Sequence, residues 1–256
     1  MTRIELSGSI VVVTGAGISL ASGIPTFRGK DPGAIWSADV MTLATWEFFE
    51  QNPVEFWQWY LTKFGDILTK KPNAAHKALA DLEESYPGSF TLITQNVDTL
   101  HEQAGSKPLK VHGSADRVRC TSFGCRFSAP RGLLPYNPED DIRTFLANPC
   151  LDLIPKCSAC RSILRPHILM FDEFYLDHLA YRFDDAIKAA NDANTILFVG
   201  TSFAVSITDL VLSAGRKSKA KMYSIDPHHS PPLDVEWVEE RAEDFLPTIL
   251  PIQQIT

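Results

Sequence analysis

Four of the five cysteines in this 256-residue sequence fall into two closely spaced pairs. Cys120 and Cys125 form a C-x4-C pair, and Cys157 and Cys160 form a C-x2-C pair further along the chain. Each short loop can bring both of its sulfur atoms to one ion, and four thiolates suit a closed, tetrahedral and therefore structural zinc site. The alternative is a set of buried or incidental thiols without a metal. Cys150 stands apart from both pairs, which favours a core thiol over a replacement zinc ligand.

A second group of chemically active side chains follows a short apolar run, Phe90–Thr94, that predicts a strand. Gln95, Asn96 and Asp98 come directly after it, and His112 follows the next short strand. The carboxyl ends of parallel strands form the ligand-binding edge of an open α/β sheet, so these side chains are expected at one site. An imidazole titrates near neutrality and can accept a proton from a hydroxyl group. A lone histidine at a strand end is usually structural, but the polar cluster beside it favours a catalytic role for His112.

The turn near the start of the sequence has the residues for binding a phosphate. Ile10–Val13 is a run of β-branched residues, typical of a buried parallel strand. Gly15 and Gly17 follow, and without a Cβ they allow a sharp turn and a close backbone approach to an anion, although such turns also occur without a ligand. A Gly-Ile-Pro sequence stops the next helix after Ile18–Ser22, so the full crossover helix and the acidic second strand of a dehydrogenase are missing. A nucleotide site built here therefore differs from that of a dehydrogenase.

Short apolar runs and helical patterns alternate along the rest of the chain. The predicted strands are Ile10–Val13, Phe90–Thr94, Leu109–Val111, Thr195–Val199 and Lys221–Ile225. The predicted helices are two over residues 46–68 that break at Asn52-Pro53, one over residues 73–86 with Asn73 as N-cap, one over residues 177–191, and a short C-terminal helix from Phe245. Residues 120–160 lose this periodicity. The alternation predicts one doubly wound α/β domain with a parallel sheet, interrupted by a smaller zinc-bearing module.

Composition and charge are those of an ordinary globular protein. The sequence is 45% hydrophobic and 21% charged, and no apolar run approaches the roughly 20 residues of a membrane span. The formal net charge of -7 argues against a nucleic-acid-binding surface. The first predicted strand begins at Ile10, which leaves no room for a leader peptide after Met1. We therefore expect a soluble intracellular protein, cytoplasmic, nuclear or both, and mitochondrial only if a presequence precedes this chain.

Taken together, these motifs resemble the sirtuins, a family of NAD-dependent protein lysine deacylases. The matching motifs occur in the family's order and span nearly the whole chain: Gly15-Ala16-Gly17-Ile18-Ser19, Ser22-Gly23-Ile24-Pro25, Phe27-Arg28-Gly29, Thr94-Gln95-Asn96-Val97-Asp98, His112-Gly113, the two cysteine pairs and Gly200-Thr201-Ser202. The resemblance implies a Rossmann-like NAD-binding domain over residues 1–35, 72–117 and 165–256. It also implies a small domain with a helical part over residues 36–71 and a zinc-binding part over residues 118–164, and a cleft between the two domains.

By this resemblance, NAD would bind along the strand ends beside a catalytic histidine. The implied cofactor-binding residues are Gly15, Ala16, Gly17, Ser19, Phe27, Arg28, Gln95, Asn96, Asp98, Gly200, Thr201, Ser202, Ser224, Asp226 and Ala242. Ser224 and Asp226 stand where relatives usually carry Asn and Glu. The implied catalytic residues are His112, Asn96 and Arg28. In the implied reaction the acyl oxygen of a modified lysine attacks the ribose carbon as nicotinamide leaves, and His112 activates a ribose hydroxyl, which gives free lysine and acyl-ADP-ribose.

Three positions resemble the class III sirtuins, which prefer succinyl and malonyl groups. Thr26 replaces the aspartate of most other classes, Ala44 matches a small residue that opens the acyl channel, and Tyr60 matches the first residue of a Tyr-x-x-Arg pair. Lys63 departs from that pair, and an ammonium holds a carboxylate less selectively than a guanidinium does. The alternative is a solvated lysine on the wet face of an aromatic helix. We therefore expect a broad deacylase that acts on succinyl or malonyl, acetyl and crotonyl groups.

The same resemblance places an extended substrate peptide between two strand edges of the protein. The implied substrate-binding residues are Ala44, Tyr60, Lys63, Leu169, Phe171 and Val205. Asp172 carries a charge where the family usually has glycine, so peptide entry is expected to differ. The expected partners are acyl-lysine proteins or peptides, with histones and metabolic enzymes as candidates. The chain is expected to be a monomer that binds neither nucleic acid nor a membrane.

Three alternatives come from other functional classes. A sirtuin-like ADP-ribosyltransferase would use the same activated ribose with a protein nucleophile. An NAD-binding sensor or scaffold would bind the cofactor without turnover, which the presence of His112, Asn96, Asp98 and Arg28 disfavours. A conventional dehydrogenase is disfavoured by the missing crossover helix.

Overall fold

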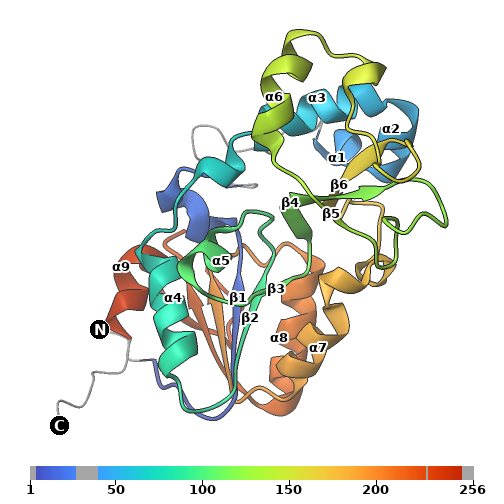
Figure 1. The fold of residues 1–256 in the computed structure, drawn as a ribbon. Coiled ribbons are helices and arrows are strands. Elements are labelled where there is room, and N and C mark those ends of the chain that lie inside the picture. The colour runs from blue at the N-terminus through green and yellow to red at the C-terminus, as the bar shows by residue number, and fades with distance from the viewer. Residues whose placement is uncertain (1–3, 27–39, 229, 250–256) are drawn as a thin grey trace.

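In the computed structural model, which describes residues 4–26, 40–228 and 230–249, six strands form one parallel sheet in the order β3-β2-β1-β7-β8-β9 (Figure 1). The strands are β1 Ile10–Thr14, β2 Phe90–Thr94, β3 Leu109–Lys110, β7 Thr195–Val199, β8 Lys221–Ile225 and β9 Glu236–Val238. The chain adds β2 and β3 on one side of β1, and β7 to β9 on the other. The strand order therefore reverses between β1 and β7, and a ligand is expected outside the carboxyl ends of these two strands.

Helices cover both faces of the sheet, which explains why β1 is apolar at consecutive positions (Figure 1). Ile10 and Val12 pack in a core with α4 and α9, while Val11 and Val13 pack on the opposite face with α7 and α8. These helices are α4 Ala74–Ser85, α7 Phe183–Asn191, α8 Ser206–Ser218 and α9 Ala242–Phe245. A strand buried on both faces needs no alternation of apolar and polar residues. The strand pairs of this sheet are all parallel, so the predicted parallel sheet is confirmed.

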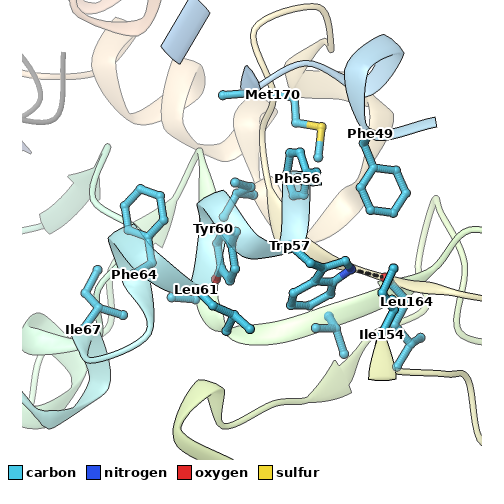
Figure 2. Close-up of a cluster of buried hydrophobic side chains, with 14 of the residues drawn as sticks. Phe49, Phe56, Trp57, Tyr60, Leu61, Phe64, Ile67, Ile154, Leu164 and Met170 are labelled. Atoms are coloured by element: carbon cyan, nitrogen blue, oxygen red, sulfur yellow. Dashed lines mark hydrogen bonds between the residues drawn. The ribbon is translucent and has the colours of Figure 1, made fainter. Parts of the chain in front are cut away.

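A smaller module lies beyond the carboxyl edge of the sheet (Figure 1). Its own antiparallel sheet has the order β5-β4-β6, and several helices pack around it. These elements are α1 Val40–Leu43, α2 Trp46–Gln51, α3 Pro53–Phe64, β4 Gly113–Cys120, β5 Leu134–Pro135, α6 Pro138–Ala147 and β6 Leu164–Ile168. Figure 2 shows the aromatic core that joins helix to sheet, in which the Trp57 Nε1 donates to the carbonyl oxygen of Leu164 at 3.1 Å. Helix α3 is thereby fixed on β6.

One glycine marks the passage from the large sheet to the small one. Gly113 directly follows His112 and pairs with Ile168 of β6. Its φ of 83° lies in the left-handed region, and a Cβ at this position would lie 2.0 Å from the carbonyl oxygen of His167. Only glycine fits without movement of the backbone. The position of His112 is thus set by the junction of the two sheets.

The helix boundaries agree with the sequence at two signals and differ at a third. The break at Asn52-Pro53 separates α2 from α3, and the Asn73 side chain accepts a hydrogen bond from the Ala75 N–H at the start of α4. The helix predicted over residues 177–191 is wrong at its start, because α7 begins only at Phe183. Two 3-10 turns precede α7, and Arg182 between them and the helix has a left-handed φ of 50°.

Within the described residues, no helix is both long enough and apolar enough to cross a membrane.

Candidate functional site

A cavity of about 1070 Å³ opens at the carboxyl edge of the parallel sheet, where the small module meets it. Its walls include the segments that follow β1, β2, β7 and β8. Residues that the sequence assigned to cofactor, catalysis and substrate meet in this lining: Gly15, Ala16, Gly17, Ser19, Ala44, Gln95, Asn96, Asp98, His112, Leu169, Phe171, Gly200, Thr201, Ser202, Val205, Asp226 and Ala242. The structure therefore brings together residues that are far apart in the sequence.

Two glycine turns pack against each other at one wall of this cavity. The backbone N–H groups of Gly15 and Gly17 donate to the carbonyl oxygens of Val199 and Gly200, at 3.0 and 2.9 Å. A Cβ on Gly17 would lie 2.7 Å from the Cα of Gly200, so no larger residue fits. The helix that follows is a short 3-10 helix that ends at Gly23, which has a left-handed φ of 80°. This wall is backbone rather than side chain, as the close approach of a dinucleotide pyrophosphate requires.

A buried polar network fixes the side chains behind the glycine turn. The Asn96 Nδ2 donates to the carbonyl oxygen of Gly15 at 3.0 Å and to the Ser19 Oγ at 3.1 Å. The Ser19 hydroxyl in turn donates to the Asp98 Oδ2 at 2.9 Å, and the Leu100 N–H donates to the Asp98 Oδ1 at 3.0 Å. Asp98 is 4% exposed, so its carboxylate is held by hydrogen bonds in a buried position. The amide and carboxylate are thus oriented before any ligand arrives.

A pair of neutral histidines, His76 and His101, lies beside this network. The His101 Nε2 lies 3.0 Å from the Thr14 hydroxyl, and the rings of His76 and His101 are 4.8 Å apart. Burial lowers the pKa of His76 to about 4, and burial also lowers the pKa of His101 well below its ordinary value. Both imidazoles are therefore uncharged at neutral pH, and His101 acts as a structural residue beneath the site.

His112 has the geometry of a general base. Its Nδ1 lies 2.9 Å from the carbonyl oxygen of Gln95, which can only accept, so Nδ1 carries the proton. The Nε2 atom of the neutral ring then carries the lone pair, and the Tyr175 hydroxyl lies 3.2 Å from it. Burial lowers the pKa of His112 to about 4, and the hydrogen bond to Gln95 opposes that shift. The ring is thus neutral at physiological pH and can accept a proton at Nε2.

Of the four positions compared with the class III sirtuins, Thr26 and Ala44 line the cavity, whereas Tyr60 and Lys63 do not. The cavity lining at the α3 side is apolar and is made by Ala44, Trp59, Phe64 and Ile67. Tyr60 is fully buried among the aromatic rings of the small module (Figure 2), and burial raises the pKa of its hydroxyl.

Lys63, by contrast, is exposed to solvent and does not line the cavity. The three-residue spacing of Tyr60 and Lys63 predicts a shared helix face, but helix α3 turns the first into the core and the second outward. The structure thus gives this pair no common surface on which to hold a carboxylate.

Asp172 has a defined structural role at the predicted peptide-binding edge. Its two carboxylate oxygens accept hydrogen bonds from the N–H groups of Trp46 and Glu47, at 2.6 and 3.0 Å. These are the first residues of α2, whose N–H groups have no partner within the helix. The neighbouring Phe171 N–H donates to the carbonyl oxygen of Ala44 at 3.0 Å. The charge that departs from the family pattern therefore ties this edge to α2.

Glu173 fixes the same segment from its other side. Its carboxylate accepts hydrogen bonds from Arg119 at 2.6 Å and from Arg165 at 2.6 and 2.9 Å. It also accepts the N–H of Met170 at 3.0 Å. The side chains of both arginines are almost fully buried, so the ion pairs satisfy charges that solvent does not reach.

The four paired cysteines converge as the spacing predicts. The Cys120 and Cys160 sulfur atoms lie 3.5 Å apart, those of Cys125 and Cys157 lie 3.7 Å apart, and all four lie within 4.8 Å of one another. A zinc ion with four sulfur ligands at about 2.3 Å would separate the sulfurs by about 3.8 Å, so the residues fit this metal. Cys150 does not belong to this group.

Some sequence-assigned residues fall outside this description. Phe27 and Arg28 lie outside the described residues. Ser224 is buried and does not line the cavity, whereas Asp226 does. The lining also contains residues that no sequence motif marked: Trp59, Phe64, Ile67, Tyr175, His228, Arg241 and Glu243. They lie on helices and loops without a recognisable spacing, so only the folded chain reveals them.

Comparison with known proteins gives consistent results. The family model described as "Sir2 family" matches residues 15–207. A protein of Leptospira interrogans named NAD-dependent protein deacylase is 38% identical over 86% of this chain and 82% of its own length. An Aeropyrum pernix protein with the same name is 37% identical over 92% of this chain and 88% of its own length.

Solved structures agree with the sequence comparisons. A Sir2 homologue in complex with NAD has a TM-score of 0.76 and 31% identity, over 94% of this chain and 88% of that chain. A Sir2 mutant bound to a p53 peptide and NAD has a TM-score of 0.74 and 28% identity, over 94% and 91% of the two chains.

Proposed function

The chain belongs to the Sir2 family, and on that premise we propose that it is an NAD-dependent protein deacylase that removes acyl groups from lysine side chains. The observation that carries the proposal is the state of His112. Its ring is neutral, and its Nδ1–H donates to the carbonyl oxygen of Gln95. His112 lines the same cavity as the glycine turn at Gly15 and Gly17. A base at this place suits the activation of a hydroxyl group on a bound nucleotide.

The chain's own residues bind and orient the co-substrate. The turn at Gly15 and Gly17 would receive the pyrophosphate, Asn96 and Asp98 would meet the nicotinamide riboside half, and Asp226 would meet the adenosine half. When bound, NAD supplies an electrophilic ribose carbon and a nicotinamide leaving group. His112 would accept the hydroxyl proton at Nε2 while the other proton stays on Nδ1, hydrogen-bonded to the Gln95 carbonyl oxygen, so the ring becomes a cation for the duration of the transfer.

The acyl group would enter the apolar side of the cavity. Ala44, Trp59, Phe64 and Ile67 line this side and favour acetyl and crotonyl groups, which carry no charge. Succinyl and malonyl groups would be accepted less efficiently, because Lys63 is exposed and lies off the cavity. The peptide on either side of the lysine would follow the edge formed by Leu169, Phe171 and Val205.

The proposal is tested by incubating the protein with NAD and matched acetyl, crotonyl, succinyl and malonyl versions of one peptide. We expect deacylated peptide and acyl-ADP-ribose in equal amounts, with the highest kcat/KM on the uncharged groups. ADP-ribose attached to protein without deacylated peptide would instead indicate a transferase. The ratio of kcat/KM for succinyl over acetyl peptide should be the same in Lys63→Met and in the wild type, and a fall in that ratio would return Lys63 to substrate selection.

A further inference from the structure

A tyrosine that no sequence motif marked contacts the proposed base. The Tyr175 hydroxyl lies 3.2 Å from the His112 Nε2, and the two rings are nearly parallel, at 17° with centroids 5.8 Å apart. Because Gln95 fixes the proton on Nδ1, Nε2 can only accept from Tyr175 in the neutral state. The tyrosine therefore donates to the same lone pair that would receive a substrate proton.

The Tyr175 ring is also held by an aromatic stack. It packs on Phe183 at the start of α7, with centroids 4.7 Å apart and planes 7° apart. The Tyr175 ring therefore packs against both His112 and Phe183.

The segment that carries Tyr175 is anchored independently of the helices. Tyr175 opens a short 3-10 turn, Tyr175–Asp177, two residues after Glu173. Glu173 is bound by the buried arginines Arg119 and Arg165. The hydroxyl is thus placed by an ion-pair anchor and a ring stack.

From this chain of contacts we propose that Tyr175 is a positioning residue for His112. The two hydrogen bonds run in one direction, from the Tyr175 O–H to His112 Nε2 and from His112 Nδ1–H to the Gln95 carbonyl oxygen. Each bond polarises the next, which holds the imidazole in one tautomer and one orientation. The inference rests on the proposed role of His112 as the base.

During proton transfer the tyrosine gains and loses no proton. A substrate O–H displaces the Tyr175 O–H from the Nε2 lone pair, the substrate O–H bond breaks, and an Nε2–H bond forms. The Tyr175 proton stays on its own oxygen throughout. In the resting state the contact stabilises the neutral ring, because a donor at Nε2 competes with protonation there.

Other ionisable side chains also line the cavity around His112 and Tyr175. They are Asp98, Glu173, Asp226, His228, Arg241 and Glu243. Burial raises the pKa of Glu173, but Arg165 and Arg119 outweigh that effect and lower it overall, so this carboxylate stays ionised to lower pH than an ordinary glutamate. Burial lowers the pKa of His112, and the hydrogen bond to the Gln95 carbonyl oxygen partly offsets that shift.

The test compares Tyr175→Phe, which keeps both ring stacks and removes only the hydroxyl, with the wild type. Nitrogen-15 NMR of the free protein measures the His112 pKa and tautomer, and steady-state kinetics with NAD and acetyl peptide measures kcat/KM against pH. Tyr86→Phe is the matched control, because its hydroxyl donates to the Gly8 carbonyl oxygen at 2.9 Å, away from the cavity.

We expect Tyr175→Phe to raise the His112 pKa and to move the acidic limb of the kcat/KM profile to higher pH by the same amount. The kcat at neutral pH should fall roughly tenfold with little change in the KM for peptide, the scale of one lost hydrogen bond. Replacing Tyr175 by 3-fluorotyrosine, a stronger donor, should shift the His112 pKa in the opposite direction. The Tyr86→Phe control should match the wild type.

If Tyr175→Phe has the same His112 pKa and the same kcat as the wild type, the proposal is overturned and Tyr175 is only a packing residue. If Tyr175→Phe does not fold, the 3-fluorotyrosine protein decides the question, since its ring has almost the same shape. A wild-type protein without deacylase activity would contradict the proposed function alone, because the NMR titration of His112 requires no substrate.

Discussion

The protonation state and orientation of His112 depend on its contacts with Gln95 and Tyr175 and on its burial. The residue type alone predicts none of these. The Gln95 carbonyl selects the tautomer, and burial keeps the ring neutral. The sequence predicted His112 and the cluster Gln95, Asn96 and Asp98, because strand ends of a parallel sheet meet at one edge. It could not predict Tyr175, because this residue lies in a 3-10 turn that replaces the expected start of the helix, and no sequence motif marks that turn.

Asp172 provides a test at the residue scale. Asp172→Ala removes both acceptors at the start of α2 and should lower the free energy of unfolding by about 1 to 2 kcal/mol. Urea unfolding followed by circular dichroism measures the loss. Glu50→Ala, an exposed change in the same helix, is the control and should cost less than about 0.5 kcal/mol. Equal losses in the two variants would show that the carboxylate does not stabilise α2.

At the scale of elements, the sequence predicted best where both faces of a segment are buried. The bounds of β2, β7 and β8 are those predicted, because a continuous apolar run between turn residues has few alternatives. Helix α8 was missed, since SITDLVLSAGRKS contains Ser, Thr and Gly and has no clear start signal. The strands β4 and β6 were missed because β4 mixes charged and apolar residues within an irregular region.

Gly113 is the element-scale test of how the two sheets position His112. Gly113→Ala places a Cβ 2.0 Å from a backbone oxygen and at a left-handed φ, so β4 must move away from β6. Gly105→Ala is the matched control, with a φ of 108° and no atom within 4 Å of the added Cβ. The control should cost about 1 to 2 kcal/mol in unfolding free energy, and Gly113→Ala should cost at least about 2 kcal/mol more and should also reduce activity. Similar losses in both variants would mean that the close contact is easily relieved.

At the scale of the whole molecule, the cysteine cluster joins the last residue of β4 to the loop before β6. Metal analysis should find one zinc per chain, and chelation should unfold the small module as well as lower activity. Cys125→Ser should lose the metal and lower the Tm, whereas Cys150→Ser should keep both. Less than half an equivalent of metal in a fully folded protein would contradict the zinc interpretation.

Buried neutral histidines make the whole fold sensitive to acid. Burial lowers the pKa of His167 to about 2, and the pKa values of His76 and His101 are lowered as well. An unfolded imidazole has a pKa of about 6.5, so below this pH the unfolded chain binds protons that the folded chain excludes, and stability falls as the pH falls.

For His167 the expected loss of unfolding free energy is about 2 kcal/mol between pH 6.5 and pH 5. Urea unfolding at pH 7.5 and pH 5 measures the total change in unfolding free energy. In His167→Gln that change should be smaller by the contribution of His167. Equal unfolding free energies of the wild type at the two pH values would show that these rings are protonated in the folded state.

The role of His112 as the base of an NAD-dependent deacylase can be measured by removing its imidazole. Wild type and His112→Ala are incubated with NAD and an acetyl-lysine peptide, mass spectrometry quantifies deacylated peptide and acyl-ADP-ribose, and calorimetry measures NAD binding. We predict that the wild type forms both products in equal amounts and that His112→Ala loses roughly 100-fold or more in kcat/KM while it still binds NAD. Turnover of His112→Ala at the wild-type rate, or a wild type that forms no deacylated peptide, would contradict this role.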